Sequence, residues 1–223
     1  MQLLDVRAVL FDLDGVLVDS RQPIADSINH ALERAGRARL PAAALHPRIG
    51  DPLHQIFAAL DPEADPGWIE GCIAAYREHY ARASLVLARS FPDVDAALAE
   101  LSRRRPLGVA TSKPVHFAEP ILDALGLRRH FAAVVGPGLD ARIESKNDVV
   151  AEALAALDLA PGPFGAPPVA ALVGDRHHDV RAARALGLAA VGVTWGIGGA
   201  EELRDAGAGW LVDAPGDLPG LFA

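Results

Sequence analysis

Five short apolar runs recur along the chain, and each of them ends at a polar or glycine-rich turn. They are RAVLF at 7–11, LGVA at 107–110, AAVV at 132–135, VAALV at 169–173 and AAVGV at 189–193. Runs of this length without polar alternation predict strands buried on both faces, as in a parallel sheet. Apolar positions at helical spacing lie between them, at 91–104, 145–159 and 177–187. The alternation predicts an α/β fold with a doubly wound parallel sheet, which binds ligands beyond the carboxyl ends of its strands.

The stretch from about residue 17 to 88 differs, because it carries helical patterns and no convincing strand. Two of its patterns open with Asp-Pro, a capping residue followed by a proline in the first helical turn. We therefore expect a helical domain over 17–88, inserted into a core domain formed by 1–16 and 89–223. In the core domain, Pro120 interrupts an apolar helical pattern and predicts a helix that is kinked or split.

Composition limits the partners and the compartment. The net charge of −8 argues against a nucleic-acid or membrane partner, since either would require basic patches. Cys72 is the only cysteine, which excludes an internal disulfide and favours a reducing compartment. The chain has no apolar stretch of about 18 residues and no signal-peptide core at its start. We expect a soluble cytoplasmic protein, a monomer or homodimer, that holds an anionic ligand with local positive groups or a metal.

Carboxylates, hydroxyls and an ammonium stand where four of the apolar runs end or the next helix begins. They are Asp12, Asp14, Thr111, Ser112, Lys146, Asp175 and Asp179. A buried strand avoids an unpaired carboxylate, so the acids indicate the open edge of the sheet. Gly15 directly after Asp14 indicates that the chain turns there and redirects that side chain.

This set of groups suits phosphoryl transfer through an aspartyl-phosphate. A carboxylate approaches an anionic phosphate only after charge neutralisation, which Mg²⁺ on hard oxygen ligands supplies. A second carboxyl protonates the departing alkoxide and later deprotonates water. Hydroxyls and an ammonium hold the transferring oxygens.

Four segments in this order resemble the motifs of the haloacid dehalogenase (HAD) superfamily. They are DLDGVLVDS at 12–20, TSK at 111–113, the isolated Lys146 and GDRHHD at 174–179. The resemblance covers essentially the whole chain, and residues 191–212 resemble the phosphoglycolate phosphatase-like branch. It implies a Rossmann-like HAD core and a helical cap domain, which corresponds to residues 17–88.

The resemblance also implies roles for the acidic residues. Asp12 corresponds to the nucleophile and Asp14 to the general acid/base. Mg²⁺ would be bound by the carboxylates of Asp12 and Asp175 and by the backbone carbonyl of Asp14. Asp179 would act on the metal directly or through water, or would only stabilise the start of its helix.

Phosphate binding is implied for Thr111, for the backbone of Ser112 and for Lys146, which would also orient the nucleophile. Lys113 and Lys146 are the only lysines among 21 basic residues, so both positions are candidates for a task that arginine cannot perform. We expect Lys113 to begin a helix at the edge of the site. The adjacent His177 and His178 point in different directions and are expected to be structural or surface residues.

The substrate is left open. We expect a phosphatase for a small phosphate ester, with phosphoglycolate as the lead. The alternatives are a β-phosphoglucomutase-type mutase or a nucleotide or sugar phosphatase, because Val16 stands where many members have threonine. A non-enzymatic regulatory or binding module on the same fold is the remaining alternative. Dehalogenase and phosphonate-cleaving activities are disfavoured, since Asp14 is present and residues 17–88 contain no lysine.

Overall fold

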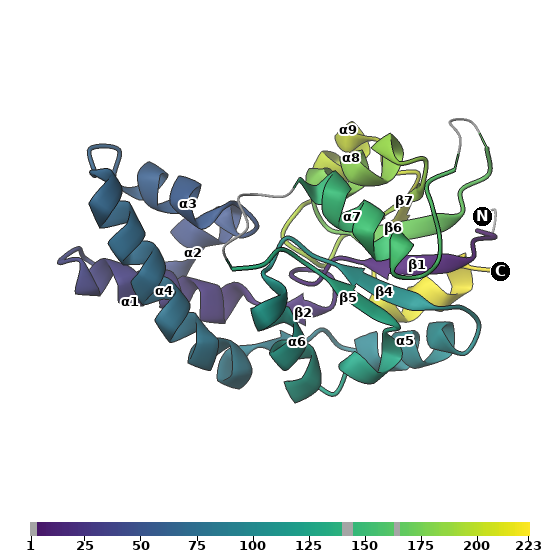
Figure 1. The fold of residues 1–223 in the computed structure, drawn as a ribbon, viewed down its shortest axis with the longest axis horizontal. Coiled ribbons are helices and arrows are strands. Elements are labelled where there is room, and N and C mark those ends of the chain that lie inside the picture. Colours follow the sequence, from purple (N-terminus) through teal and green to yellow (C-terminus); the bar gives the residue numbers. More distant parts are fainter. Residues whose placement is uncertain (1–3, 140–144, 163–165) are drawn as a thin grey trace. The chain divides into compact units, whose positions relative to one another are not determined.

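Six parallel strands form one sheet (Figure 1). They are β1 (Ala8–Phe11), β4 (Leu107–Ala110), β5 (Ala133–Val135), β6 (Ala170–Gly174), β7 (Ala189–Val193) and β8 (Trp210–Val212). The predicted doubly wound parallel sheet is confirmed. The hydrophobic pattern does not predict β8, because its run is short and Trp210 and Leu211 are only half-buried.

The structure is a computed structural model that describes residues 4–139, 145–162 and 166–223. The chain divides into two compact units, which we call the core unit (Met1–Asp19 and Ser90–Ala223) and the helical unit (Ser20–Arg89). The sheet belongs to the core unit. Two short strands, β2 (Val18–Asp19) and β3 (Arg89–Ser90), pair where the chain passes from one unit to the other.

The strand order locates the ligand-binding edge of the sheet. The order is β5-β4-β1-β6-β7-β8, so the chain starts at the centre, builds one side and then crosses to the other. Register places Val9 of β1 between Leu107 of β4 and Ala171 of β6. In such sheets the crevice lies beyond the carboxyl ends of the strands where the order reverses. The ends of β1, β4 and β6 therefore form the expected site.

Helices cover both faces of the sheet. One side carries α7 (Lys146–Ala155), α8 (His177–Ala185) and α9 (Ala200–Ala206), and the other carries α5 (Val94–Ser102) and α6 (Val115–Ala124) (Figure 1). Two 3-10 helices, η2 (Arg128–His130) and η3 (Pro215–Leu221), complete the core unit. On the first side, Leu10 and Leu172 of the sheet pack with Val150, Leu154 and Val180 in one buried cluster. Burial of this apolar stripe holds α7 and α8 in place.

The split expected at Pro120 is wrong, because α6 is a single helix that contains this proline. Pro120 is exposed and lies in the second turn, so it removes only one backbone hydrogen bond. The opposite face buries Phe117, Ala118, Ile121 and Leu122. Burial of four apolar side chains outweighs a proline cost of about 3 kcal/mol.

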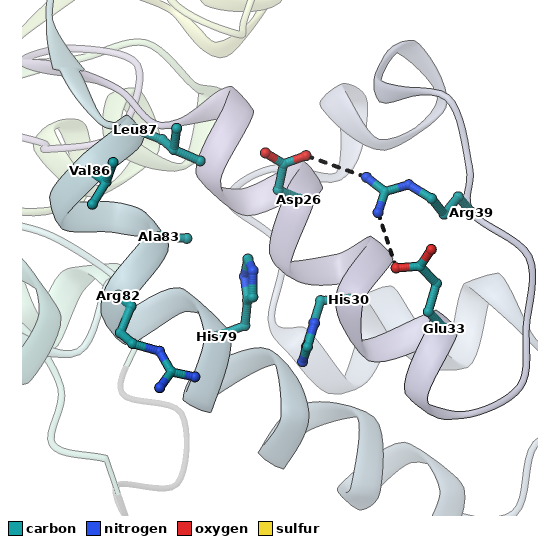
Figure 2. A pocket seen from close by; sticks show the side chains of 9 residues that line it. All are labelled: Asp26, His30, Glu33, Arg39, His79, Arg82, Ala83, Val86 and Leu87. Carbon is teal, nitrogen blue, oxygen red and sulfur yellow. Dashed lines mark hydrogen bonds and ion pairs between the residues drawn. The ribbon is translucent and has the colours of Figure 1, made fainter.

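The helical unit contains α1 (Arg21–Arg34), α2 (Ala42–Leu45), η1 (His46–Arg48), α3 (Leu53–Leu60) and α4 (Pro66–Leu87). The predicted Asp-Pro cap is present at α4, where Asp65 accepts a hydrogen bond from the Trp68 N–H at 3.0 Å. The same prediction is wrong for α3, whose N-cap is Pro52 and which has no side-chain cap. A pocket of about 490 Å³ lies between α1 and α4, and His30 and His79 stack inside it (Figure 2). Among the described residues, no helix combines the length and apolar character that crossing a membrane requires.

Candidate active site

The predicted site residues converge at one edge of the sheet in the core unit. Asp12 directly follows β1, Thr111 directly follows β4 and Asp175 directly follows β6. Lys146 is the first residue of α7, and Asp179 lies in the first turn of α8. The parallel register brings these positions, distant in the sequence, to the point where the strand order reverses.

A tight turn after β1 sets the directions of Asp12 and Asp14. The Asp12 N–H donates to the Val173 carbonyl of β6 at 2.9 Å, which extends the sheet pairing by one residue. Gly15 follows with a φ of +83°, and a Cβ there would lie 2.1 Å from Oδ2 of Asp175. Only glycine fits this conformation and this space. The turn indicated by the sequence is thus present, and it lets the Asp175 carboxylate approach the backbone of the turn.

Lys146 holds the Asp12 carboxylate. Its Nζ donates to Asp12 Oδ1 at 2.6 Å and to the Ala110 carbonyl at 2.8 Å, and it lies 2.8 Å from Oδ1 of Asp179. Burial disfavours its charge, but the attraction of Asp12 and Asp179 and the hydrogen bonds they accept raise the pKa of Lys146 above its ordinary value. The lysine is therefore charged, and its three N–H groups match three protein oxygens.

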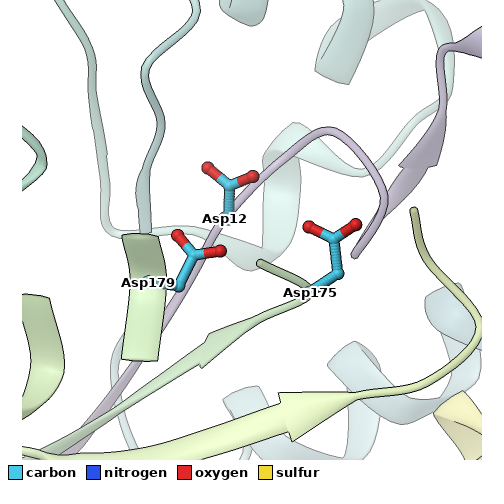
Figure 3. A group of neighbouring side chains, drawn as sticks. All are labelled: Asp12, Asp175 and Asp179. Atoms are coloured by element: carbon cyan, nitrogen blue, oxygen red, sulfur yellow. The ribbon is translucent and has the colours of Figure 1, made fainter. Parts of the chain in front are cut away.

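Three carboxylates lie close to one another at this edge of the sheet (Figure 3). Asp12, Asp175 and Asp179 each offer an oxygen, and these oxygens lie within 4.8 Å of one another. Asp175 is fully buried, and its Oδ2 accepts the Ile197 N–H at 2.7 Å. Its Oδ1 accepts no hydrogen bond from any described residue. A buried oxygen without a donor, beside two further carboxylates, fits a hard divalent cation.

The protonation behaviour of the carboxylates shows an excess of negative charge. Burial raises the pKa of Asp175 to about 8, helped by the charges of Asp179 and Asp12 and opposed by the Ile197 hydrogen bond. Burial also raises the pKa of Asp12 to about 6, although Lys146 opposes this shift. One ammonium does not compensate these three carboxylates, of which Asp175 and Asp179 are buried, whereas a divalent cation would.

Asp14 forms an ion pair with Lys113. Lys113 Nζ donates to Asp14 Oδ1 at 2.6 Å, and the lysine side chain is only 7% exposed. The expectation for Lys113 is therefore wrong: α6 begins at Val115, and Lys113 lies inside the site instead of at its edge. The sequence contained a signal for this position, since Lys113 is one of two lysines in an arginine-rich chain.

The hydroxyl pair after β4 has one buried and one exposed member. Thr111 is buried, and its Oγ1 accepts the Lys113 N–H at 3.1 Å, so its hydroxyl hydrogen can be donated to a ligand. Ser112 is exposed and follows in the same turn. These positions are compatible with the phosphate-binding roles that the resemblance implies, which remain predictions.

Structural contacts occupy the polar groups at the start of α8. Glu202 Oε1 accepts the His177 N–H at 2.9 Å and lies 2.6 Å from His177 Nδ1, and Arg176 Nε donates to it at 3.0 Å. Burial alone would raise the pKa of Glu202, but these hydrogen bonds lower it to about 2. Asp179 accepts the Arg176 N–H at 3.2 Å, which stabilises the helix start. His177 thus supports α8, as expected. The two histidines do not point in different directions, since the ring of exposed His178 lies against that of His177 with centroids 3.7 Å apart.

The geometry and the family comparison agree. A parallel sheet that carries paired aspartates after its central strand, with a lysine and further acids beyond the neighbouring strands, is the arrangement of a HAD-type hydrolase. Residues 9–193 match the family model for haloacid dehalogenase-like hydrolases. The chain therefore belongs to the haloacid dehalogenase-like hydrolase family, as the sequence motifs predict.

Individual relatives indicate which branch of the family this chain resembles. The chain is 35% identical over 232 residues to a phosphoglycolate phosphatase of Chromobacterium violaceum, across 100% of this chain and 99% of that protein. It is 37% identical to the tyrosine-protein kinase PtkA of Mycobacterium tuberculosis over 86% of its own length, and it spans only 64% of that relative. A solved structure described as a predicted phosphatase from Clostridium acetobutylicum matches with a TM-score of 0.86 and 31% identity over 98% of both chains. The resemblance to phosphatase-type hydrolases of the phosphoglycolate phosphatase-like branch is thus confirmed.

Proposed function

We propose that this protein is a Mg²⁺-dependent phosphomonoesterase that hydrolyses a small phosphate ester through an aspartyl-phosphate. The observation that carries the proposal is the position of Asp12. Its carboxylate is fixed by Lys146 and lies beside Asp175 and Asp179, whose oxygens fit a divalent cation. Similarity to phosphoglycolate phosphatase over the full chain supports phosphoglycolate as the lead substrate.

Asp12 acts as the nucleophile. Lys146 engages Oδ1, which fixes the carboxylate plane while one carboxylate oxygen attacks phosphorus. The new O–P bond forms as the ester P–O bond breaks, and the leaving alkoxide departs with the electron pair. The charge on Lys146 also balances the negative charge that accumulates as the phosphate approaches.

Asp14 supplies and removes the protons. Asp14 donates a proton to the leaving alkoxide in the first step. It lies two residues after the nucleophile, at the turn that Gly15 forms. In the second step Asp14 takes a proton from water, whose oxygen attacks the phosphorus of the aspartyl-phosphate. Inorganic phosphate leaves, and Asp12 returns to its free carboxylate.

Phosphate oxygens are bound by Thr111, by the backbone of Ser112 and by Lys146. The buried Thr111 hydroxyl is fixed by the Lys113 N–H, so it can donate to a phosphate oxygen with little reorganisation. Mg²⁺ held by Asp12, Asp175, the Asp14 carbonyl and, directly or through water, Asp179 would neutralise the phosphate charge.

We further propose that the helical unit acts as a cap that excludes bulk water during transfer. Its lack of lysine fits a phosphatase better than a phosphonate-cleaving enzyme, which needs an amine there. The expected domain limits, the cytoplasmic location, the small-molecule partner and the monomeric or homodimeric state stay predictions.

A phosphate-release screen tests the proposed function. The purified protein is assayed with phosphoglycolate, a sugar phosphate, a nucleoside monophosphate and an aryl phosphate, each with Mg²⁺ and with a chelator. We expect Mg²⁺-dependent phosphate release, fastest with phosphoglycolate. Isomerised sugar phosphate without phosphate release would favour the mutase alternative, and no turnover of any ester would favour the binding module.

A further inference from the structure

The two lysines of this chain hold the two aspartates of the turn after β1, one each. Lys146 Nζ lies 2.6 Å from Asp12 Oδ1, and Lys113 Nζ lies 2.6 Å from Asp14 Oδ1. All other positive side chains apart from histidine are arginines. The first contact belongs to the proposed nucleophile. The second contact has no counterpart in the roles described so far.

The Lys113–Asp14 pair is built into the sheet. Its partners are 99 positions apart in sequence, yet they follow the adjacent strands β1 and β4, which the pairing of Phe11 with Val109 holds in register. The Lys113 side chain is 7% exposed and that of Asp14 is 17% exposed. A buried ammonium is costly unless it is paired, so this contact holds both side chains in place, unlike an exposed surface ion pair.

The backbone around Lys113 is also fixed. Its N–H donates to Thr111 Oγ1 at 3.1 Å, and the Val115 N–H donates to the Pro137 carbonyl at 3.0 Å. The loop after β5 passes so close that a Cβ on Gly136 would lie 2.4 Å from the Lys113 carbonyl oxygen. The loop after β4 and the loop after β5 are therefore in close contact. Lys113 approaches Asp14 from a rigid support.

We propose that Lys113 is a positioning residue that aims Asp14 at the leaving-group oxygen, an inference that rests on the proposed function. Protonated Asp14 donates its proton from one carboxyl oxygen, so an ammonium hydrogen-bonded to the other oxygen, Oδ1, orients the group without taking part in that transfer. An arginine can donate to the same oxygen, but its larger planar fork fits this buried space less well than the compact ammonium does. Lys113 acts through Asp14 and makes no separate contribution to the chemistry.

A double-mutant cycle tests this role, with kcat/KM as the readout because it reports the steps up to the first transfer. Lys113→Met, Asp14→Asn and the double variant are assayed on phosphoglycolate and on p-nitrophenyl phosphate with Mg²⁺. We expect Lys113→Met to lower kcat/KM for phosphoglycolate by about tenfold or more, within the range of general acid catalysis. The aryl ester should lose less, because its leaving group needs no proton. In the Asp14→Asn background the second substitution should change kcat/KM by less than about twofold, since the group that it positions is gone.

A matched control comes from Arg176, a half-buried cation beside Asp175 that Glu202 holds. Arg176→Met should affect both esters equally and combine additively with Asp14→Asn. Lys113→Gln repeats the cycle if Lys113→Met does not fold, as judged by circular dichroism. Lys113→Arg should lose less kcat/KM for phosphoglycolate than Lys113→Met does.

Two outcomes overturn the inference, and they are distinguishable. Additive losses, or equal losses on both esters, in a wild-type protein that hydrolyses them show that Lys113 does not act through Asp14. Failure of the wild-type protein to hydrolyse either ester contradicts the proposed function, and the positioning role falls with it.

Discussion

The position of Lys146 permits little change of side chain. Its nitrogen lies at 2.6–2.8 Å from oxygens of Asp12, Ala110 and Asp179 in a buried position. A guanidinium cannot place one nitrogen among three oxygens without displacing them. We expect Lys146→Arg to lower kcat by about a hundredfold or more, the scale of losing one preorganised electrostatic contact. Steady-state kinetics, with folding checked by circular dichroism, measure the loss.

Lys113→Arg provides the comparison. Lys113 Nζ donates to Asp14 Oδ1, and an arginine can donate to the same oxygen. We therefore expect Lys113→Arg to retain more activity than Lys146→Arg. An active Lys146→Arg variant beside an inactive Lys113→Arg variant would mean that turnover depends on Lys113 and not on Lys146, and the proposed role of Lys146 would be wrong.

Asp175 is a residue where function opposes stability. Its pKa is raised from 3.8 to about 8, so the folded protein binds a proton that the unfolded chain releases. Stability without a metal therefore falls as pH rises from about 4 to about 8. We expect Asp175→Asn to raise the free energy of unfolding at pH 8 by roughly 2 kcal/mol in a chelator, and to weaken Mg²⁺ binding. Denaturant titrations at pH 5 and pH 8 measure this. A variant less stable than wild type at pH 8 would contradict the account of an uncompensated carboxylate.

At the scale of elements, the helix pair α1–α4 carries a pH-sensitive contact. His30 and His79 stack with ring centroids 4.5 Å apart. Ser27 Oγ donates to the Pro23 carbonyl at 2.7 Å, so the 3.0 Å contact with His79 Nδ1 requires that nitrogen to carry the proton. Neutral and charged His79 can both carry that proton, so the hydrogen bond to Ser27 is not itself the cause of the pH dependence. Burial, followed by the nearby His30, lowers the pKa of His79 below 6.5.

The lowered pKa of His79 predicts how the stability of the helical unit depends on pH. A histidine with a lowered folded-state pKa is protonated more readily in the unfolded chain, so stability is lost as pH falls below about 6.5. We expect hydrogen exchange in α1 and α4 to accelerate between pH 7.5 and pH 5.5 beyond the intrinsic pH effect. His79→Gln keeps a donor for Ser27 and should reduce this dependence. An equal dependence in both proteins would show that other groups cause it.

The elements of the sheet followed from the sequence because buried parallel strands leave continuous apolar runs. The run at 189–193 and strand β7 coincide, whereas β8 is half-buried and leaves no such run. Pro120 shows the opposite failure, since a local rule predicted a break that the buried face of α6 overrides. The site residues were recognisable by their positions at strand ends. The Lys113–Asp14 contact was not, because it depends on the register between β1 and β4.

At the scale of the whole molecule, the chain passes twice between the core unit and the helical unit, after Asp19 and after Arg89. A cap that opens for substrate and closes for transfer requires hinges, which we place at residues 16–20 and 84–91. We expect backbone hydrogen exchange in these segments to slow when Mg²⁺ and a phosphate analogue are added together. Exchange that is the same with and without both ligands would count against a mobile cap.

The different roles proposed for Asp12 and Asp14 predict different effects on turnover by the whole molecule. Asp14→Asn should fold and bind Mg²⁺, because the metal contact assigned to it is a backbone carbonyl. It should nevertheless lose most of its activity on alkyl phosphates, where the leaving group needs a proton. Rate measurements on phosphoglycolate test this, and a near-wild-type rate would show that Asp14 is not the acid/base.

In the proposed mechanism Asp12 itself becomes phosphorylated. The direct measurement is peptide mass spectrometry of protein quenched in acid during turnover of phosphoglycolate with Mg²⁺, with Asp12→Asn as the matched control. We expect a phosphoryl group on Asp12 in the wild-type protein, and neither phosphoenzyme nor phosphate release in Asp12→Asn, because an amide does not attack phosphorus. A phosphoryl group on a different residue, or phosphate release by Asp12→Asn at the wild-type rate, would contradict it.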